Sequence, residues 1–311
     1  MLRKLVGSVV VLAAVAGAGF WYLTAPVRVA PERLAGLTPG DAAKGEQVFW
    51  AGGCASCHAS PGAKGEARLV MAGGHRLVSD FGTFVAPNIS SGDAGIGKWS
   101  FEDFANAMMA GVAPDGSHLY PSFPYTSYAR MKPQDVADLY AFMKTLPASD
   151  NVAASHELGF PFNIRRALGA WKWLYLTPGP VVSIADASPT VQRGQYLVEG
   201  PGHCGECHTP RNLIGGSEKA QWLAGANAAE GDGVVPNITG GEGGIGGWSE
   251  EEIAYSLESG FTPDFDSFGG SMTDVVLNMA QISAEDREAI AAYLKAIPAH
   301  ADGYTPRKPA Q

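Results

Sequence analysis

All four cysteines of this 311-residue chain lie in two copies of one five-residue pattern, Cys-x-x-Cys-His, at residues 54–58 and 204–208. The pattern is typical of c-type haem attachment. Its two thiols form thioethers with one porphyrin, and the following histidine binds the iron. Arg211, just beyond the second copy, is expected to pair with a haem propionate through a charge-assisted hydrogen bond. The sequence thus predicts two covalently bound haem c groups, with thioethers from Cys54, Cys57, Cys204 and Cys207 and proximal iron ligands His58 and His208.

Other uses of paired cysteines fit this pattern less well. A zinc ribbon usually has its pairs about 15–20 residues apart, whereas the two pairs here lie in different halves of the chain. A thioredoxin-like redox pair follows a buried strand, and no Val- or Ile-rich stretch precedes either pair. Simple disulfides stay open as an alternative, but they give no reason for a histidine at the same place twice.

The composition indicates a folded, loop-rich chain. Hydrophobic residues make up 46% and charged residues 17% of the sequence, which is typical of globular proteins. The 40 glycines and 21 prolines indicate many loops and short helices. The formal net charge of -9 argues against nucleic acid as a partner and against an anionic lipid surface.

The N-terminal residues indicate export and a membrane anchor. Arg3 and Lys4 precede an uncharged apolar run at residues 5–23, which is long enough to cross a hydrocarbon core of about 30 Å. The positive-inside rule then leaves the N-terminus in the cytoplasm and exports the rest. A cleaved signal is the alternative, since residues 16–18 read Ala-Gly-Ala. We predict an anchor or signal helix within residues 1–28 and a single-pass protein of the bacterial inner membrane, facing the periplasm.

Much of the sequence around the first haem motif recurs around the second. Ala-Pro-Asn-Ile at residues 86–89 returns as Val-Pro-Asn-Ile at 235–238. Gly-Ile-Gly-x-Trp-Ser occurs at residues 95–100 and again at 244–249. In each half we expect a short helix before the haem motif, another after the tryptophan, and a final amphipathic helix ended by proline. The expected helices before the motifs and at the ends of the halves span about residues 41–50, 189–199, 135–147 and 286–298.

The chain resembles membrane-anchored dihaem cytochromes c and is similar to the cytochrome c subunits of periplasmic bacterial dehydrogenases, such as the alcohol dehydrogenase cytochrome subunit. The residues that carry this resemblance are the Pro-Asn-Ile and Gly-Ile-Gly-x-Trp units, Cys-His-Thr-Pro-Arg-Asn at 207–212 and Leu-Tyr-Pro-Ser-Phe-Pro-Tyr-Thr-Ser-Tyr at 119–128. The alcohol dehydrogenase subunit has three haem motifs, so this chain has one fewer. The resemblance implies a mostly α fold, with two class I cytochrome c-like domains in tandem after an N-terminal transmembrane helix.

The expected domains are joined by an aromatic linker. Its middle, residues 165–176, is both basic and aromatic. It either docks a partner or the membrane interface, or it is a strap that packs the two domains together. The strap is favoured, because a flexible linker would not contain so many aromatic residues. The predicted divisions after the anchor are cytochrome c domain 1 at 36–149, the linker at 150–188, cytochrome c domain 2 at 189–300 and a tail at 301–311.

The resemblance assigns the sixth iron ligand more clearly in the second half than in the first. Met272 matches the ligand position of the family, and Met279, closer to the final helix, is its competitor. The equivalent position of the first half is Phe123, which cannot bind iron. Met131 is the preferred substitute. His118 is an alternative that would give a bis-histidine haem, and a site left open beside Phe123 is the third possibility.

Electron transfer is the function that the resemblance implies. A periplasmic dehydrogenase subunit oxidises its substrate, and the haems pass the electrons to quinone, a soluble cytochrome or an oxidase. The alternative is a dihaem peroxidase-like enzyme with an open haem site in domain 1. Few acid–base groups other than His118 and Asp115 lie in the first-half loop. We therefore expect an electron-transfer protein with no catalytic residues of its own, a dehydrogenase and a downstream acceptor as partners, and no nucleic acid.

Overall fold

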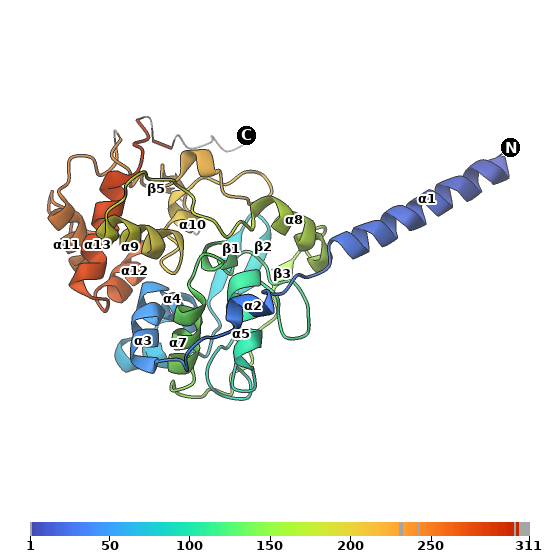
Figure 1. Cartoon of the computed structure of the whole chain (residues 1–311), viewed down its shortest axis with the longest axis horizontal. Helices are drawn as coiled ribbons and strands as arrows, with labels where there is room; N and C mark the ends of the chain where they lie inside the picture. The colour runs from blue at the N-terminus through green and yellow to red at the C-terminus, as the bar shows by residue number, and fades with distance from the viewer. Residues whose placement is uncertain (1, 230–232, 242, 302, 305–311) are drawn as a thin grey trace.

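The structure, a computed structural model, describes residues 2–229, 233–241, 243–301 and 303–304. A long helix, α1 (Leu2–Leu23), projects from a head of short elements (Figure 1). By length and composition α1 is apolar enough to cross a membrane, although a signal sequence would pass the same test. Most of the predicted tail at 301–311 lies outside the described residues.

The head is mostly helical, as predicted, and its helices follow a similar order in the two halves. The first half contains α2 (Pro31–Leu34), α3 (Ala42–Ala51), α4 (Cys54–His58), the 3-10 helix η1 (Gly65–Leu69), α5 (Phe101–Ala110), α6 (Tyr125–Tyr128) and α7 (Pro133–Met143). The second half contains α9 (Pro189–Glu199), α10 (Gly205–His208), η3 (Lys219–Gln221), α11 (Glu250–Ser259), α12 (Met272–Met279) and α13 (Ala284–Ala296). The predicted helices before the motifs and at the ends of the halves are thus confirmed.

A close crossing of the first and last helix organises each half. A Cβ atom on Gly45 of α3 would lie 2.0 Å from the carbonyl oxygen of Asp138 in α7. A Cβ atom on Gly194 of α9 would lie 1.8 Å from the carbonyl oxygen of Ala289 in α13. Only glycine permits backbones to approach this closely, so both crossings depend on a glycine in the helix before the haem motif.

The helices that follow the tryptophans begin and end alike. Ser100 is the N-cap residue of α5 and Ser249 is that of α11. Each forms a capping box with the acidic residue three positions later. Gly111 and Gly260 end these helices in the left-handed region, with φ of 60° and 78°. The hydroxyl of Ser283 accepts a hydrogen bond from Asp286, the third residue of α13, so this helix begins two residues before the predicted 286.

Two small sheets were not expected from the sequence. The strands β1 (Arg76–Ser79), β2 (Gly82–Val85) and β3 (Glu157–Leu158) form an antiparallel sheet in the order β1-β2-β3. The strands β4 (Ala226–Asn227) and β5 (Val234–Val235) pair in the second half. All five lie in stretches predicted as loops. They are very short, and β3 comes from the linker, so that its pairing leaves no local pattern in the sequence.

The linker contacts both halves through η2 (Arg165–Ala167) and α8 (Leu168–Tyr175). The ammonium group of Lys172 donates hydrogen bonds of 2.7 Å to the carbonyl oxygens of Ala110 and Gly111 at the end of α5. On the other side, the Tyr175 hydroxyl accepts a 2.9 Å hydrogen bond from the Asn212 side chain. These contacts are those that the strap hypothesis predicts.

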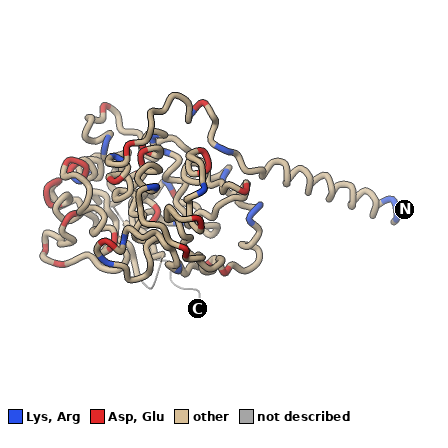
Figure 2. The backbone as a smooth tube through the Cα atoms, turned by 90° about the horizontal axis from the view of Figure 1, so that it is seen from below, with Lys and Arg blue, Asp and Glu red and all other residues tan. Residues whose placement is uncertain are grey.

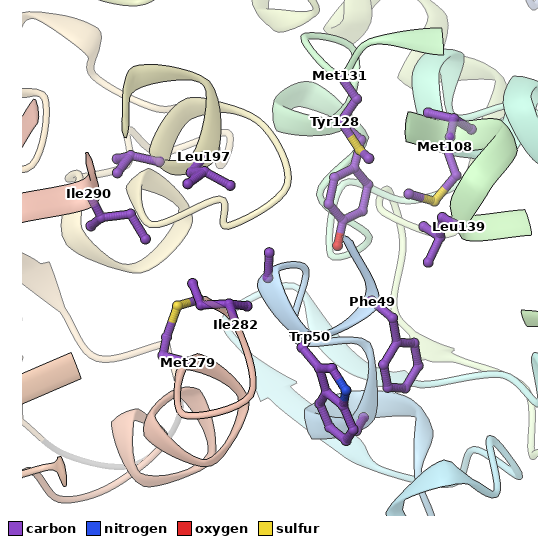
Figure 3. Close-up of a cluster of buried hydrophobic side chains, with 14 of the residues drawn as sticks. Phe49, Trp50, Met108, Tyr128, Met131, Leu139, Leu197, Met279, Ile282 and Ile290 are labelled. Carbon is purple, nitrogen blue, oxygen red and sulfur yellow. The ribbon is translucent and has the colours of Figure 1, made fainter. Parts of the chain in front are cut away.

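The buried apolar side chains form one connected cluster that extends through both halves (Figure 3). Phe49 and Met131 belong to it from the first half, and Leu197 and Met279 from the second. In Figure 3, Tyr128 lies beside Met131, and Trp50 lies beside Phe49. Among the described residues, the two halves therefore share a core.

Candidate haem sites

The first haem motif forms the single helical turn α4. Gly53 precedes it with φ of 58°, a left-handed conformation that lets the chain turn sharply into the helix. Cys54 and Cys57, three positions apart on this turn, lie on one face. The Nδ1 atom of His58 donates a 2.9 Å hydrogen bond to the carbonyl oxygen of Pro87. Because Nδ1 carries the proton, the lone pair of Nε2 is left to bind a metal.

The second motif repeats this arrangement. Cys204 is the residue before α10, and His208 ends that helix. The Nδ1 atom of His208 donates a 2.9 Å hydrogen bond to the carbonyl oxygen of Pro236. This explains why the Pro-Asn-Ile unit occurs twice in the sequence: each copy supplies the carbonyl that fixes the tautomer and ring direction of a proximal histidine.

The asparagine of each Pro-Asn-Ile unit holds this carbonyl in place. The Oδ1 atom of Asn88 accepts a 2.8 Å hydrogen bond from the amide of Ser90, and its Nδ2 donates to the carbonyl of Ser149 at 2.8 Å. Asn237 makes the equivalent bonds in the second half, donating to the carbonyl of His300 at 3.0 Å. Each asparagine therefore ties the proximal loop to the chain that leaves the final helix. The sequence showed the unit but not this role.

Burial keeps the first thiol group and the imidazole group of each motif neutral. Burial raises the pKa of the Cys54 and Cys204 thiols to about 12, so both are neutral before the thioethers form. Burial also lowers the pKa of His58 and His208, which keeps the imidazoles neutral. A neutral imidazole with a free Nε2 lone pair is the form that binds iron. The donor set at both motifs therefore fits haem c.

The two motifs lie against each other, which the sequence did not indicate. His203, directly before the second motif, lies with Nε2 3.2 Å from the carbonyl oxygen of Gly52, close before the first. In each motif, the third residue also makes a hydrogen bond to the other half of the chain. Within the first motif, the Ser56 hydroxyl accepts a 2.7 Å hydrogen bond from Asn278, the last residue but one of α12. The Arg68 guanidinium donates a 2.6 Å hydrogen bond to the side-chain amide oxygen of Asn278.

The second motif makes the reciprocal contact. The Glu206 carboxylate accepts 2.9 Å hydrogen bonds from the hydroxyls of Thr126 and Ser127, and Ser127 is the last residue but one of α6. Arg211 forms an ion pair with the same carboxylate. Burial acts to raise the pKa of Glu206, but the Arg211 charge and the two hydroxyls outweigh it, and the pKa is lowered. We call the Ser56–Asn278 and Glu206–Ser127 bonds the crossed contacts.

Comparison with known proteins agrees with this geometry. The family model for cytochrome c matches residues 42–147. A diheme cytochrome c-type protein of Cereibacter sphaeroides is 56% identical over 300 residues, which cover 96% of this chain and 99% of that protein. This chain belongs to the cytochrome c family. Covalently bound haem c is accordingly its cofactor; when bound, this haem supplies an iron that takes up and releases one electron at a time.

Two further relatives of this cytochrome c are dehydrogenase subunits, so the predicted resemblance is confirmed. The fructose dehydrogenase cytochrome subunit of Gluconobacter japonicus is 35% identical over 263 residues, 83% of this chain and 53% of that subunit. The cytochrome c subunit of the quinone alcohol dehydrogenase of Gluconobacter oxydans is 38% identical over 275 residues, 84% of this chain and 55% of that subunit. This cytochrome c thus spans about half the length of those subunits.

The distal candidates of the first half occupy different surroundings in this cytochrome c. Met131 is 2% exposed and lies in the buried cluster beside Tyr128, two residues before α7 (Figure 3). The Phe123 ring packs on the Tyr128 ring, with centroids 5.4 Å apart. His118 is also buried, but its Nε2 donates a 2.9 Å hydrogen bond to the carbonyl of Thr24, at the end of α1. This hydrogen bond of His118 therefore helps to hold the end of α1 against the head.

The two candidates for the sixth iron ligand in the second half, Met272 and Met279, are the first and last residues of α12. The helix α12 was not expected from the sequence, and Met272 is half-buried. The helix forms because Asp274 stands in its first turn and Val275, Val276 and Met279 give it an apolar face. Met279 ends α12 and is part of the buried cluster. The predicted propionate partner, Arg211, lies on Glu206 and also donates to the carbonyl of Gly215 at 2.7 Å.

Proposed function

We propose that this cytochrome c carries two haem c groups and transfers electrons from a dehydrogenase to an acceptor of the respiratory chain. The observation that carries the proposal is the duplicated proximal arrangement, in which each motif histidine is oriented by the carbonyl of a Pro-Asn-Ile unit. Haem 1 is attached through Cys54 and Cys57 with His58 on the iron. Haem 2 is attached through Cys204 and Cys207 with His208 on the iron.

We infer a tandem repeat of two cytochrome c domains, at residues 36–149 and 189–300, joined by the linker at 150–188. The equivalent helix crossings, capping boxes and proximal loops support it. The family model matches only the first of these regions, residues 42–147. The shared buried cluster supports a tight junction between such domains.

The crossed contacts support direct electron transfer between the two haems. Each crossed contact joins the third residue of a haem motif to the short helix that precedes the final helix of the other half. This short helix is α12 in one case and α6 in the other. The attachment segments of the two haems are therefore neighbours in the fold, and no protein partner is needed to relay an electron from one to the other. With electron transfer inside one chain, a dihaem cytochrome can accept an electron from one partner and pass it to another, rather than store it.

For the sixth ligands, we propose Met131 on haem 1 and Met272 on haem 2. The burial of Met131 beside the final helix of its half supports the first assignment. A methionine ligand raises the potential and blocks small ligands, as a carrier requires. The peroxidase-like alternative needs an open iron, and neither the burial of Met131 nor the names of the three relatives supports it.

The partners and location follow from the same proposal. The subunit names of two relatives support a dehydrogenase as electron donor, and we place this donor in the periplasm with the head. The length and apolar character of α1 support a single-pass anchor in the bacterial inner membrane, with the head in the periplasm. Quinone, a soluble cytochrome or an oxidase would then accept the electrons.

Haem stoichiometry tests this proposal most directly. We expect two haems per chain by the alkaline pyridine assay, and one haem in the Cys54→Ser/Cys57→Ser variant. The Cys204→Ser/Cys207→Ser variant is the matched control and should also retain one. One haem in the unsubstituted chain would overturn the dihaem assignment. Rapid turnover of hydrogen peroxide by the reduced protein would overturn the carrier assignment in favour of the peroxidase.

A further inference from the structure

Seven exposed apolar side chains lie in three segments close to the base of α1. These segments are the linker before η2, the helix α8 with its end, and the loop after the second haem motif. Figure 1 shows α8 and β3 at the end of the head from which α1 projects. We name these side chains the collar: Phe160, Phe162, Ile164, Trp173, Leu174, Leu213 and Ile214.

Direct contacts join the three segments into one surface. The Trp171 ring nitrogen in α8 donates a 2.9 Å hydrogen bond to the carbonyl oxygen of Ile214. The rings of Phe81 and Phe162 pack edge to face with centroids 5.0 Å apart. A Cβ atom on Gly215 would lie 3.2 Å from the same Phe81 ring. Phe81 and Trp171 thus connect the collar segments, which are far apart in sequence.

The collar is fixed to the end of α1. The Arg166 guanidinium lies 4.2 Å from the centroid of the Trp21 ring, and its Nε donates to the Thr24 hydroxyl at 3.1 Å. The start of α8 approaches α1 so closely that a Cβ atom on Gly169 would lie 2.3 Å from the carbonyl oxygen of Thr24. Where α1 leaves a bilayer, the collar is therefore held beside it and is not free to turn away.

The charge distribution favours lipid as the occupant despite the net charge of -9. Arg165 and Arg166 directly follow Ile164 of the collar, and Arg28 follows Thr24 by four residues. Figure 2 shows several basic segments near the base of α1 with a few acidic ones, while larger acidic groups lie at the opposite end of the head. Glu157, close to the collar in sequence, is paired with Arg76. Arginines and exposed aromatic residues beside a membrane helix match the phosphate and acyl boundary of a bilayer.

We propose that the collar docks the head onto the outer surface of the membrane that α1 spans. The inference depends on the proposed anchoring by α1 and goes beyond it. A simple anchor holds the head on a tether, whereas a docked collar places apolar side chains of the head itself in the lipid interface. The haem domains would then stand in one orientation above the bilayer.

Spin labelling of the full-length protein in lipid nanodiscs tests this. We would label Leu213→Cys, whose side chain is 85% exposed, and Phe265→Cys, which is 95% exposed and lies away from the collar, as the matched control. We expect the label at 213 to be several-fold less accessible to a water-soluble nickel reagent than the label at 265, and more accessible to oxygen. Co-migration of the chain with the discs is measured in the same samples.

The outcomes separate the two proposals. Equal nickel accessibility at 213 and 265 in a chain that co-migrates with the discs overturns the collar and leaves the anchor standing. A chain that does not enter the discs overturns both. Protection at 213 that appears only when a dehydrogenase subunit is added, and not with lipid alone, overturns lipid as the occupant and assigns the collar to a protein partner.

Discussion

The two methionines that we propose as sixth iron ligands differ in their surroundings. Met131 is enclosed by the buried cluster, whereas Met272 begins a helix and is half-buried. Two haems attached in the same way but covered differently would have different reduction potentials. Single substitutions of these methionines can test whether the two haems differ in their sixth ligands.

The Met131→Ala variant should lose the sixth ligand of haem 1. We expect half of the haem to become high-spin in the ferric state and to bind carbon monoxide in the ferrous state. Met108→Ala is the matched control, because Met108 is a buried methionine of the same cluster. Each change should destabilise the fold by about 2–5 kcal/mol, but only the first should alter the haem spectrum. An unaltered spectrum would exclude Met131 as the ligand.

Lys172 makes stability depend on pH. Burial lowers the pKa of this lysine from 10.5 to about 7. The unfolded chain therefore binds more protons between these values, so the contribution of Lys172 to the free energy of unfolding rises as pH increases above about 7. We expect the stability of the native protein relative to Lys172→Met to increase from pH 6 to pH 9, by at most about 3 kcal/mol. Denaturant unfolding in detergent measures this, and a pH-independent difference would refute it.

At the scale of elements, the paired helix crossings position the haem motifs. In both halves the helix before the motif crosses the final helix at a glycine. Periodicity, prolines and capping residues made these helices predictable, because such signals are local. The strand β3 and the helical start at Met272 were missed, since one depends on pairing with a distant hairpin and the other on a short amphipathic turn next to a loop.

The Gly194→Ala variant should separate α9 from α13. The added methyl group would lie 1.8 Å from the carbonyl of Ala289, so one helix must move. We expect a loss of about 1–3 kcal/mol or more in the free energy of unfolding, with reduced haem incorporation. Gly159→Ala is the control, because nothing lies within 4 Å of its added Cβ. Equal thermal midpoints for the two variants would contradict the close crossing.

At the scale of the whole molecule, the halves are joined by contacts that no sequence pattern predicts. The haem motifs could be identified from the sequence because the two cysteines and the histidine of each motif lie within five positions. Asn278 and Ser56, by contrast, are 222 positions apart. Their hydrogen bond exists only after both halves have folded, so reading the chain from one end to the other gives no sign of it.

Removing a crossed contact should slow electron exchange between the haems. In the Asn278→Leu variant, Ser56 loses its amide partner and the two motif segments are held less firmly together. We expect a slower approach to equilibrium between the haems after rapid photoreduction, while the spectrum of each haem is preserved. Ser283→Ala, which removes a helix cap in the same half, is the control and should leave the rate unchanged. A similar rate in both variants would exclude this role.

The continuous buried cluster limits how the chain can be divided. A cut within the linker would leave side chains such as Tyr128 and Leu197 on freshly exposed surfaces, where water replaces their packing partners. Either fragment would tend to aggregate before its haem could be attached. The two halves look like copies of one unit, yet the shared buried cluster makes the stability of each depend on the other.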